Sequence, residues 1–270
     1  MSKPKLSIFC VVALALLVVP VTAAEAQTKP QQQPQGPGQE EERAITDILL
    51  SSDPTQTLTL VEKFLTTYPS SQFHGHAYMA ASQAHRLQNN FDKAIEYGER
   101  AMELNPNNAI AMILVAYAFS EGARADQPNY KERLKKAEDY SRRALNLLPE
   151  FFASIPHNPD IPEEKYKLQE NHIEAQAHAT LGFVHFRRNE LAAAEEELTK
   201  ATELNEFRPN PADFERLGLV QVQQEKYDQA RASFQRCIEI GGLPAEVCQR
   251  RLELLEQLVE QERRKQQPNP

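Results

Sequence analysis

A pair of histidines is the feature of this sequence that comes nearest to a metal-binding or catalytic site. His178 and His185 lie seven residues apart, a spacing that places both on one face of a helix. Two imidazoles presented in this way can contribute to a zinc site. His185, however, shares one position of a repeating pattern with His85, and Phe119 fills that position in another copy of the pattern. We therefore interpret both histidines as packing residues and expect no metal site.

No other set of residues supports a catalytic function. The sequence lacks a Gly-x-Ser-x-Gly motif, a glycine-rich phosphate loop and a His-Glu-x-x-His motif. Neighbouring carboxylates, such as Glu195, Glu196 and Glu197, are typical of a solvated helix surface. Only 9 of the 270 residues are glycine, too few for phosphate-cradling loops or a turn-rich β-sandwich. A net charge of −8 with no basic cluster argues against nucleic-acid binding. We predict no enzymatic activity, no cofactor and no nucleic-acid partner.

The cysteines leave two interpretations open. Cys10 lies in an N-terminal apolar segment, and the remaining two, Cys237 and Cys248, are eleven residues apart. In an oxidising compartment these two thiols can form a disulfide. Alternatively, Cys237 replaces an alanine of the repeat as a small buried residue and stays reduced.

The N-terminal residues, 1–26, have the pattern of a secretory signal peptide. Lys3 and Lys5 precede an apolar run from Leu6 to Val19, and a small-residue cleavage site ends at Ala26. The apolar run is about 14 residues long, shorter than the roughly 20 that a membrane-spanning helix needs. We therefore expect a periplasmic or secreted mature chain with no membrane insertion. An uncleaved membrane anchor is the alternative.

Residues 27–40 form a Gln- and Pro-rich segment that cannot bury apolar surface, so we expect a disordered linker. Helical periodicity begins near Glu41 and continues to about residue 265. Residues 266–270 are expected to be a disordered tail.

Between residues 75 and 244 the helical pattern repeats with a period of about 34 residues. One column of small residues on the second helix of each unit comprises Ala94, Ala137, Ala194 and Ala230. A second column, seven residues later, comprises Ala101, Ala144, Ala201 and Cys237. A third column, on the first helix of each unit, comprises Ser82, Ala116, Gly182 and Gly218. Small residues in these places let two antiparallel helices pack closely.

This pattern resembles the tetratricopeptide repeat family, of the secreted or periplasmic bacterial type. The matching stretches are residues 75–108, 109–151, 175–208 and 211–244. Pro106 and Pro149 stand where the family has a proline at the end of a repeat. Gly98 and Ser141 depart from it, because a large residue is usual at their position. The resemblance implies an all-α fold over residues 41–265, a right-handed α-solenoid of stacked antiparallel helix pairs.

Further helices are expected at both ends of the four repeats. Residues 41–74 are interpreted as a degenerate leading unit of two helices. Residues 244–265, opened by Pro244, are interpreted as a half-polar capping helix that covers the last repeat.

Two insertions interrupt the period, at residues 123–131 and 152–174. Prolines recur in the first half of the longer insertion, which is therefore predicted to be non-helical. From Pro162 the pattern predicts one continuous helix that runs into the third repeat as far as about Arg188.

In the family, fixed positions of each first helix line a concave groove that receives a peptide or a partner helix. Here the resemblance assigns to the groove Met79, Gln83, Arg86, Ile113, Tyr117, Phe183, Phe186, Arg187, Glu215, Leu219 and Val222. The set is apolar and partly aromatic, with arginines at its edges, and it lacks the Lys and Asn with which some relatives grip a terminal carboxylate. We expect an apolar partner segment with a few acidic groups. The alternative is that residues 41–65 or the long insertion fill the groove.

The sequence therefore favours a non-enzymatic protein–protein interaction scaffold of the bacterial cell envelope, with a protein or peptide partner. The alternative is a structural module that forms homo-oligomers through the solenoid and the long helix. The expected site contains no catalytic residue, no metal ligand and no cofactor.

Overall fold

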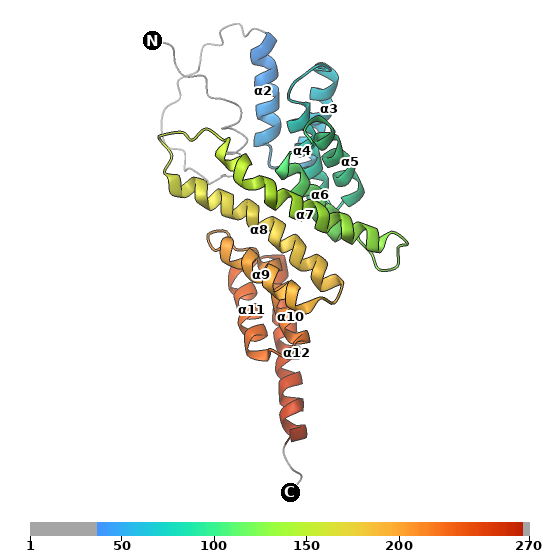
Figure 1. Cartoon of the computed structure of the whole chain (residues 1–270), viewed down its shortest axis with the longest axis vertical. Coiled ribbons are helices and arrows are strands. Elements are labelled where there is room, and N and C mark those ends of the chain that lie inside the picture. The colour runs from blue at the N-terminus through green and yellow to red at the C-terminus, as the bar shows by residue number, and fades with distance from the viewer. Residues whose placement is uncertain (1–36, 267–270) are drawn as a thin grey trace. The chain divides into compact units, whose positions relative to one another are not determined.

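The computed structural model of the chain describes residues 37–266, which contain eleven α-helices and no β-strand (Figure 1). The helices are α2 (Pro37–Leu50), α3 (Pro54–Thr67), α4 (His74–Leu87), α5 (Phe91–Leu104), α6 (Ala109–Gly122), α7 (Tyr130–Ala153), α8 (Glu163–Arg187), α9 (Leu191–Leu204), α10 (Pro211–Gln223), α11 (Tyr227–Ile240) and α12 (Leu243–Gln266). Successive helices form stacked pairs, and the all-helical repeat fold expected from the sequence is confirmed. The segment interpreted as a signal peptide and most of the expected linker lie outside the described residues.

The chain divides into two compact units. The first contains the described residues up to Gly122 together with Asn146–Tyr166. The second contains Ala123–Leu145 and the described residues from Lys167 onward.

The first unit begins with the predicted leading helix pair, α2 and α3. Ile45 and Ile48 of α2 are buried with Val61 and Phe64 of α3 in one apolar cluster. The side chain of Asp53 caps α3 by accepting a hydrogen bond of 2.6 Å from the Gln56 backbone N–H. The helix α2 begins earlier than expected, at Pro37, inside the segment predicted to be a disordered linker. A proline is favourable in the first turn of a helix, so the last residues of that segment extend α2.

The columns of small residues define the helix packing in both units. All eight residues of the two columns on the second helices are fully buried, namely Ala94, Ala101, Ala137, Ala144, Ala194, Ala201, Ala230 and Cys237. Close approach is also confirmed in the column on the first helices. A Cβ atom at Gly182 would lie 2.5 Å from Cγ of Leu198, and one at Gly218 would lie 2.5 Å from the ring of Phe234. These glycines are therefore required by the side chains that pack over them.

The long helix predicted across the second insertion is confirmed. Residues 154–162 are non-helical, and α8 then runs without a break from Glu163 to Arg187. Pro149, which stands where the family has a proline at the end of a repeat, lies inside α7, and the helix continues for another turn to Ala153. Phe151 and Phe152 in this added turn are half-buried and contact each other edge to face, with their ring centroids 5.5 Å apart.

The C-terminal helix α12 packs on α11 and α10, as expected of a capping helix. Leu255 and Cys248 of α12 are buried with Phe234 and Cys237 of α11, and Cys237 and Cys248 form a disulfide. No helix within residues 37–266 has the length and apolar character required to span a membrane.

Candidate functional site

In the first unit, three of the predicted groove residues form one contact group. The Arg86 guanidinium of α4 lies over the Tyr117 ring of α6, 4.9 Å from its centroid. The Arg86 side chain also donates a 2.9 Å hydrogen bond from Nε to Oε1 of Gln83, one turn earlier on α4. All three side chains are half-buried. A cation over an aromatic face contributes about 0.5–2 kcal/mol, so the pair is preorganised.

The other two predicted groove residues of this unit are in different environments. Met79 is half-buried and its sulfur accepts a hydrogen bond of 3.2 Å from Nδ2 of Asn108. Ile113 is only 3% exposed and belongs to the core of the unit. The helix α6 is apolar on all sides and buried by its neighbours. Ile113, which the family resemblance assigns to the groove, is therefore covered.

In the second unit, a contact group forms around Phe183 of α8. The guanidinium of Arg216 on α10 lies 4.2 Å from the centroid of the Phe183 ring, and that of Arg187 lies 5.2 Å from it. Arg187 also lies over the ring of Tyr130, at 5.3 Å, and donates a hydrogen bond to the Ala123 carbonyl. The Tyr130 hydroxyl in turn donates a 3.1 Å hydrogen bond to the Arg187 carbonyl. Arg187 therefore anchors the first insertion to the end of α8.

Sequence reasoning did not identify Tyr130 or Arg216 as members of this group. Tyr130 lies in the insertion, and Arg216 does not occupy one of the concave positions of its helix. Only the tertiary contacts of Phe183 and Arg187 reveal them.

The remaining predicted groove residues of the second unit pack within it. Phe186 packs against a cluster that contains Leu198 and Val220. Leu219 and Val222 pack against the cluster between α11 and α12, and Glu215 accepts a 2.9 Å hydrogen bond from Nε of Arg251 on α12. In this unit, Glu215 therefore contacts the capping helix, and Leu219 and Val222 pack against the cluster that α11 and α12 form.

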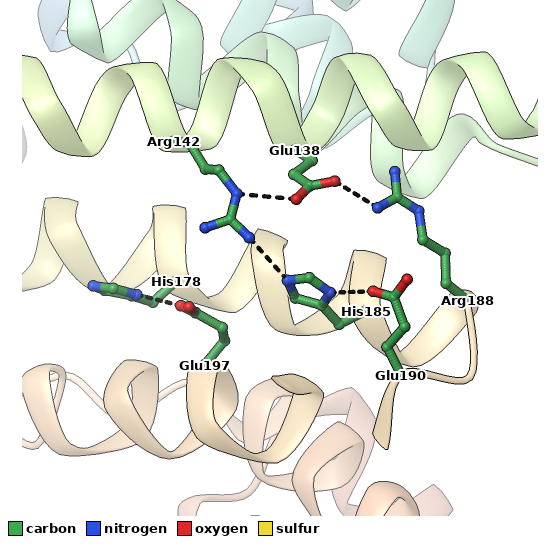
Figure 2. A network of polar contacts seen from close by, with 7 residues as sticks. All are labelled: Glu138, Arg142, His178, His185, Arg188, Glu190 and Glu197. Carbon is green, nitrogen blue, oxygen red and sulfur yellow. Dashed lines mark hydrogen bonds and ion pairs between the residues drawn. The ribbon is translucent and has the colours of Figure 1, made fainter. Parts of the chain in front are cut away.

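The histidines considered as metal ligands belong to a network of polar contacts that joins α7, α8 and α9 (Figure 2). Nδ1 of His178 lies 2.6 Å from a carboxylate oxygen of Glu197 on α9. His185 is 7% exposed, as expected of a packing residue, but both of its ring nitrogens have polar partners. Nδ1 faces the Glu190 carboxylate, and Nε2 lies 3.4 Å from a guanidinium nitrogen of Arg142 on α7.

Charge balance in this network favours ionised carboxylates. Burial opposes ionisation of Glu197, but the hydrogen bond from His178 and the positive charges of Lys200 and Arg142 leave its pKa below the usual value. Glu138 of α7 is also partly buried, and contacts with Arg188 and Arg142 likewise lower its pKa. The two histidines contact different carboxylates. Within the part of the chain that the structure describes, no three His, Cys, Asp or Glu side chains are placed to hold a metal ion.

Comparison with known proteins agrees with this architecture. Two models of the tetratricopeptide repeat match the chain, one at residues 75–108 and one at residues 214–240. Among solved structures, the chain is similar to TTC0263, a thermophilic TPR protein of Thermus thermophilus. The identity is 18%, the match covers 80% of this chain and 97% of that one, and the TM-score is 0.54.

Weaker similarity extends to two further structures. A double mutant of MamA from RS-1 is 15% identical, with 75% of this chain and 93% of that chain covered and a TM-score of 0.43. Yeast Tom70 is 16% identical, with 84% and 48% covered and a TM-score of 0.39. No curated protein sequence matches the chain. Two segments of the chain therefore match tetratricopeptide repeats, and the structure has an all-helical fold of stacked helix pairs like that of TTC0263.

Proposed function

We propose that this protein is a non-enzymatic interaction scaffold of the bacterial cell envelope that binds an apolar peptide or helix of a partner protein. Tetratricopeptide repeats generally bind protein partners and are typically non-enzymatic, and two segments of this chain match them.

The observation that carries the proposal is the pairing of arginine with half-buried aromatic rings on the first helices of the repeats. Arg86 covers Tyr117 in one unit, and Arg187 and Arg216 flank Phe183 in the other. Aromatic residues and arginine are the residue types that most often dominate binding energy at protein interfaces. An apolar partner segment would pack on the rings, and its carboxylates would pair with the guanidinium groups.

The proposed contact surface is smaller than the predicted groove. It consists of two separate groups, Met79, Gln83, Arg86 and Tyr117 in the first unit and Phe183 and Arg187 in the second. Ile113 is left out because it is buried in the core, and Phe186 because it packs against the cluster that contains Leu198 and Val220. Glu215, Leu219 and Val222 are left out because they contact the capping helix or the cluster that it forms with α11.

Export to an oxidising compartment is supported by two independent features. The N-terminal sequence has the order of a signal peptide, and the only two cysteines outside that segment are joined in the folded chain. Cell fractionation tests the location of the protein. The mass of the purified protein tests its processing, and we expect a mature chain that starts at Gln27 and has two fewer hydrogens than its dithiol form. A cytoplasmic protein with two free thiols would contradict it.

Crosslinking in living cells tests the binding surface. A photo-crosslinking residue replaces Tyr117 or Phe183, and the matched control replaces Phe207, which is 64% exposed in the turn after α9. We expect Tyr117 and Phe183 to capture the same partner chain and Phe207 to capture none. Equal capture at all three positions would contradict the proposed surface.

A second variant separates binding from folding. Tyr117→Glu is expected to abolish capture by a crosslinker at Gln83, in the same unit, while the far-ultraviolet circular dichroism and the melting temperature stay close to those of the parent protein. If the variant unfolds, Tyr117 is a core residue and the surface is wrong. Capture of a second copy of this chain, together with a dimer in light scattering, would instead support the self-associating module.

A further inference from the structure

The helix α8 is held by polar contacts on two sides, and a histidine takes part in each (Figure 2). His185 contacts Arg142 of α7, and His178, two turns earlier, contacts Glu197 of α9. Both histidines are largely shielded from solvent, with side-chain exposures of 8% for His185 and 13% for His178. His185 faces one carboxylate and one guanidinium, whereas His178 faces two carboxylates.

The neighbours of His185 require a neutral ring. A guanidinium group has only N–H donors, so Nε2 of His185 must offer its lone pair to Arg142. The proton of the neutral imidazole then resides on Nδ1, where it is donated to the Glu190 carboxylate. A second proton on Nε2 would remove the acceptor and place a positive charge against Arg142. The contact between His185 and α7 therefore exists only with the neutral imidazole.

The neighbours of His178 accept a charged ring. Nδ1 faces Glu197, and Nε2 lies 3.8 Å from the carboxylate of Glu174, one turn earlier on α8. Protonation of this imidazole gives a cation between two carboxylates. Arg142 and Lys200 also act on Glu197, but neither contacts the ring of His178.

We propose that acidification shifts the attachment of α8 from α7 to α9, because protonation breaks the contact between His185 and Arg142 and strengthens the contact between His178 and Glu197. Histidine is the side chain that ordinarily changes charge between pH 5 and 8. The same helix carries Phe183 and Arg187, on either side of His185 in the sequence.

One contact limits the movement of α7. Glu138 of α7 pairs with both Arg142 of the same helix and Arg188 at the end of α8. These two arginines lower the pKa of Glu138, so its carboxylate stays ionised when the imidazoles gain protons. The pair between Glu138 and Arg188 thus still joins α7 to the end of α8 after Arg142 loses His185, and α7 is loosened rather than detached.

Nitrogen-15 NMR of the histidine side chains tests the protonation states in the full mature protein, with His178→Gln and His185→Gln used for assignment. At pH 7.5 we expect His185 to be neutral with its proton on Nδ1. A charged His185 ring at pH 7.5, or a neutral ring protonated on Nε2, would overturn the proposal.

Hydrogen exchange at pH 7.5 and pH 5.5, corrected for the intrinsic pH dependence of exchange, tests the consequence. In the parent protein, amide protection of residues 130–145 should fall about two- to tenfold at pH 5.5, the range of a single hydrogen bond. Protection of α9 should stay equal or rise.

His185→Gln is the matched variant, because an amide side chain both donates and accepts without changing charge. It should remove the pH response of residues 130–145, whereas His178→Gln should leave that response unchanged. Equal protection of residues 130–145 at the two pH values, or loss of the response in His178→Gln, would overturn the proposal.

Discussion

The helix pairs α4–α5 and α8–α9 occupy equivalent positions of the repeat and differ in how the two helices contact each other. In α4–α5 the contacts are aromatic. The rings of Tyr78 and Tyr97 are 6.2 Å apart, and His85 stacks on Tyr97 with their centroids 5.3 Å apart. The second helices of both pairs carry the same buried alanines of the repeat.

In α8–α9 the equivalent positions carry charged groups. His178 and Glu197 stand where the first pair has Tyr78 and Tyr97, and they form a contact of 2.6 Å. His185 is equivalent to His85, but it faces a carboxylate and a guanidinium instead of a phenol ring.

The two helix pairs share the residues that determine their packing distance and differ in the residues that determine the chemistry of their contact. Small residues determine how closely the backbones approach, and this is common to both pairs. The positions between these columns tolerate either an aromatic or an ionic contact, and this choice determines how the pair responds to pH. One repeat can therefore keep its fold and change its chemistry.

The largest expected effect tests the common backbone spacing. Gly182→Ala should destabilise the protein by about 1–3 kcal/mol, because the new methyl group would overlap the Leu198 side chain and approach the Leu198 backbone nitrogen, 3.1 Å away. Chemical denaturation followed by circular dichroism gives the free energy of unfolding, since the chain has no tryptophan.

Gly75→Ala is the control for this change, because a Cβ atom there would meet nothing nearer than a Leu104 methyl carbon at 4.0 Å. It should be neutral or stabilising by about 0.5 kcal/mol. Equal losses of stability for Gly182→Ala and Gly75→Ala would show that the small residues on the first helices do not determine the distance between the paired helices.

A smaller effect distinguishes the ionic pair from the aromatic one. At pH 7, Glu197→Gln should cost about 1–2 kcal/mol, because it removes the charge from a hydrogen bond that is largely shielded from water. Tyr97→Phe keeps the ring that contacts Tyr78 and His85, and should change the free energy of unfolding by less than about 0.5 kcal/mol. The same denaturation measurement tests both variants. A larger loss of stability for Tyr97→Phe than for Glu197→Gln would contradict the difference proposed between the two helix pairs.

The smallest expected effect is the pH dependence of each pair. Burial is the main cause that lowers the pKa of His85 in α4, and burial also lowers that of His76. The unfolded chain therefore binds more protons just below pH 6.5, and stability falls as the pH decreases through this range. The lowered pKa of Glu197 adds a loss in α8–α9 that begins below about pH 4.5.

Unfolding midpoints between pH 7 and pH 4 check this order. His76→Phe should reduce the loss between pH 7 and pH 5, and Glu197→Gln should reduce the loss below pH 4.5. A midpoint that rises on acidification would have the wrong sign for both groups.

Features encoded by neighbouring residues were predicted correctly. Pro162 and the acidic residues after it indicate the start of α8, and Pro244 indicates the start of α12. The repeat position of Pro149 does not show where α7 ends, and the half-buried Phe151 and Phe152 belong to a further turn.

The candidate site was predicted less well, because exposure depends on tertiary neighbours. Arg86, Tyr117 and Phe183 were identified from their repeat positions. Ile113 and Leu219 occupy positions of the same kind, but the first is buried in its unit and the second packs at the cap. No local pattern in the sequence shows which element will cover a given face.

The disulfide at the C-terminal end of the fold has a mechanical consequence. A force that pulls on the C-terminus would peel α12 only as far as Cys248, where the covalent bond passes the load to Cys237 of α11. The residues between the two cysteines are shielded from the force, which withholds about 35–40 Å of contour length from extension. Among the described residues, α2 at the opposite end has no covalent link of this kind to its neighbours. Unravelling from the C-terminus should therefore skip residues 238–247, whereas unravelling from α2 meets no such covalent block.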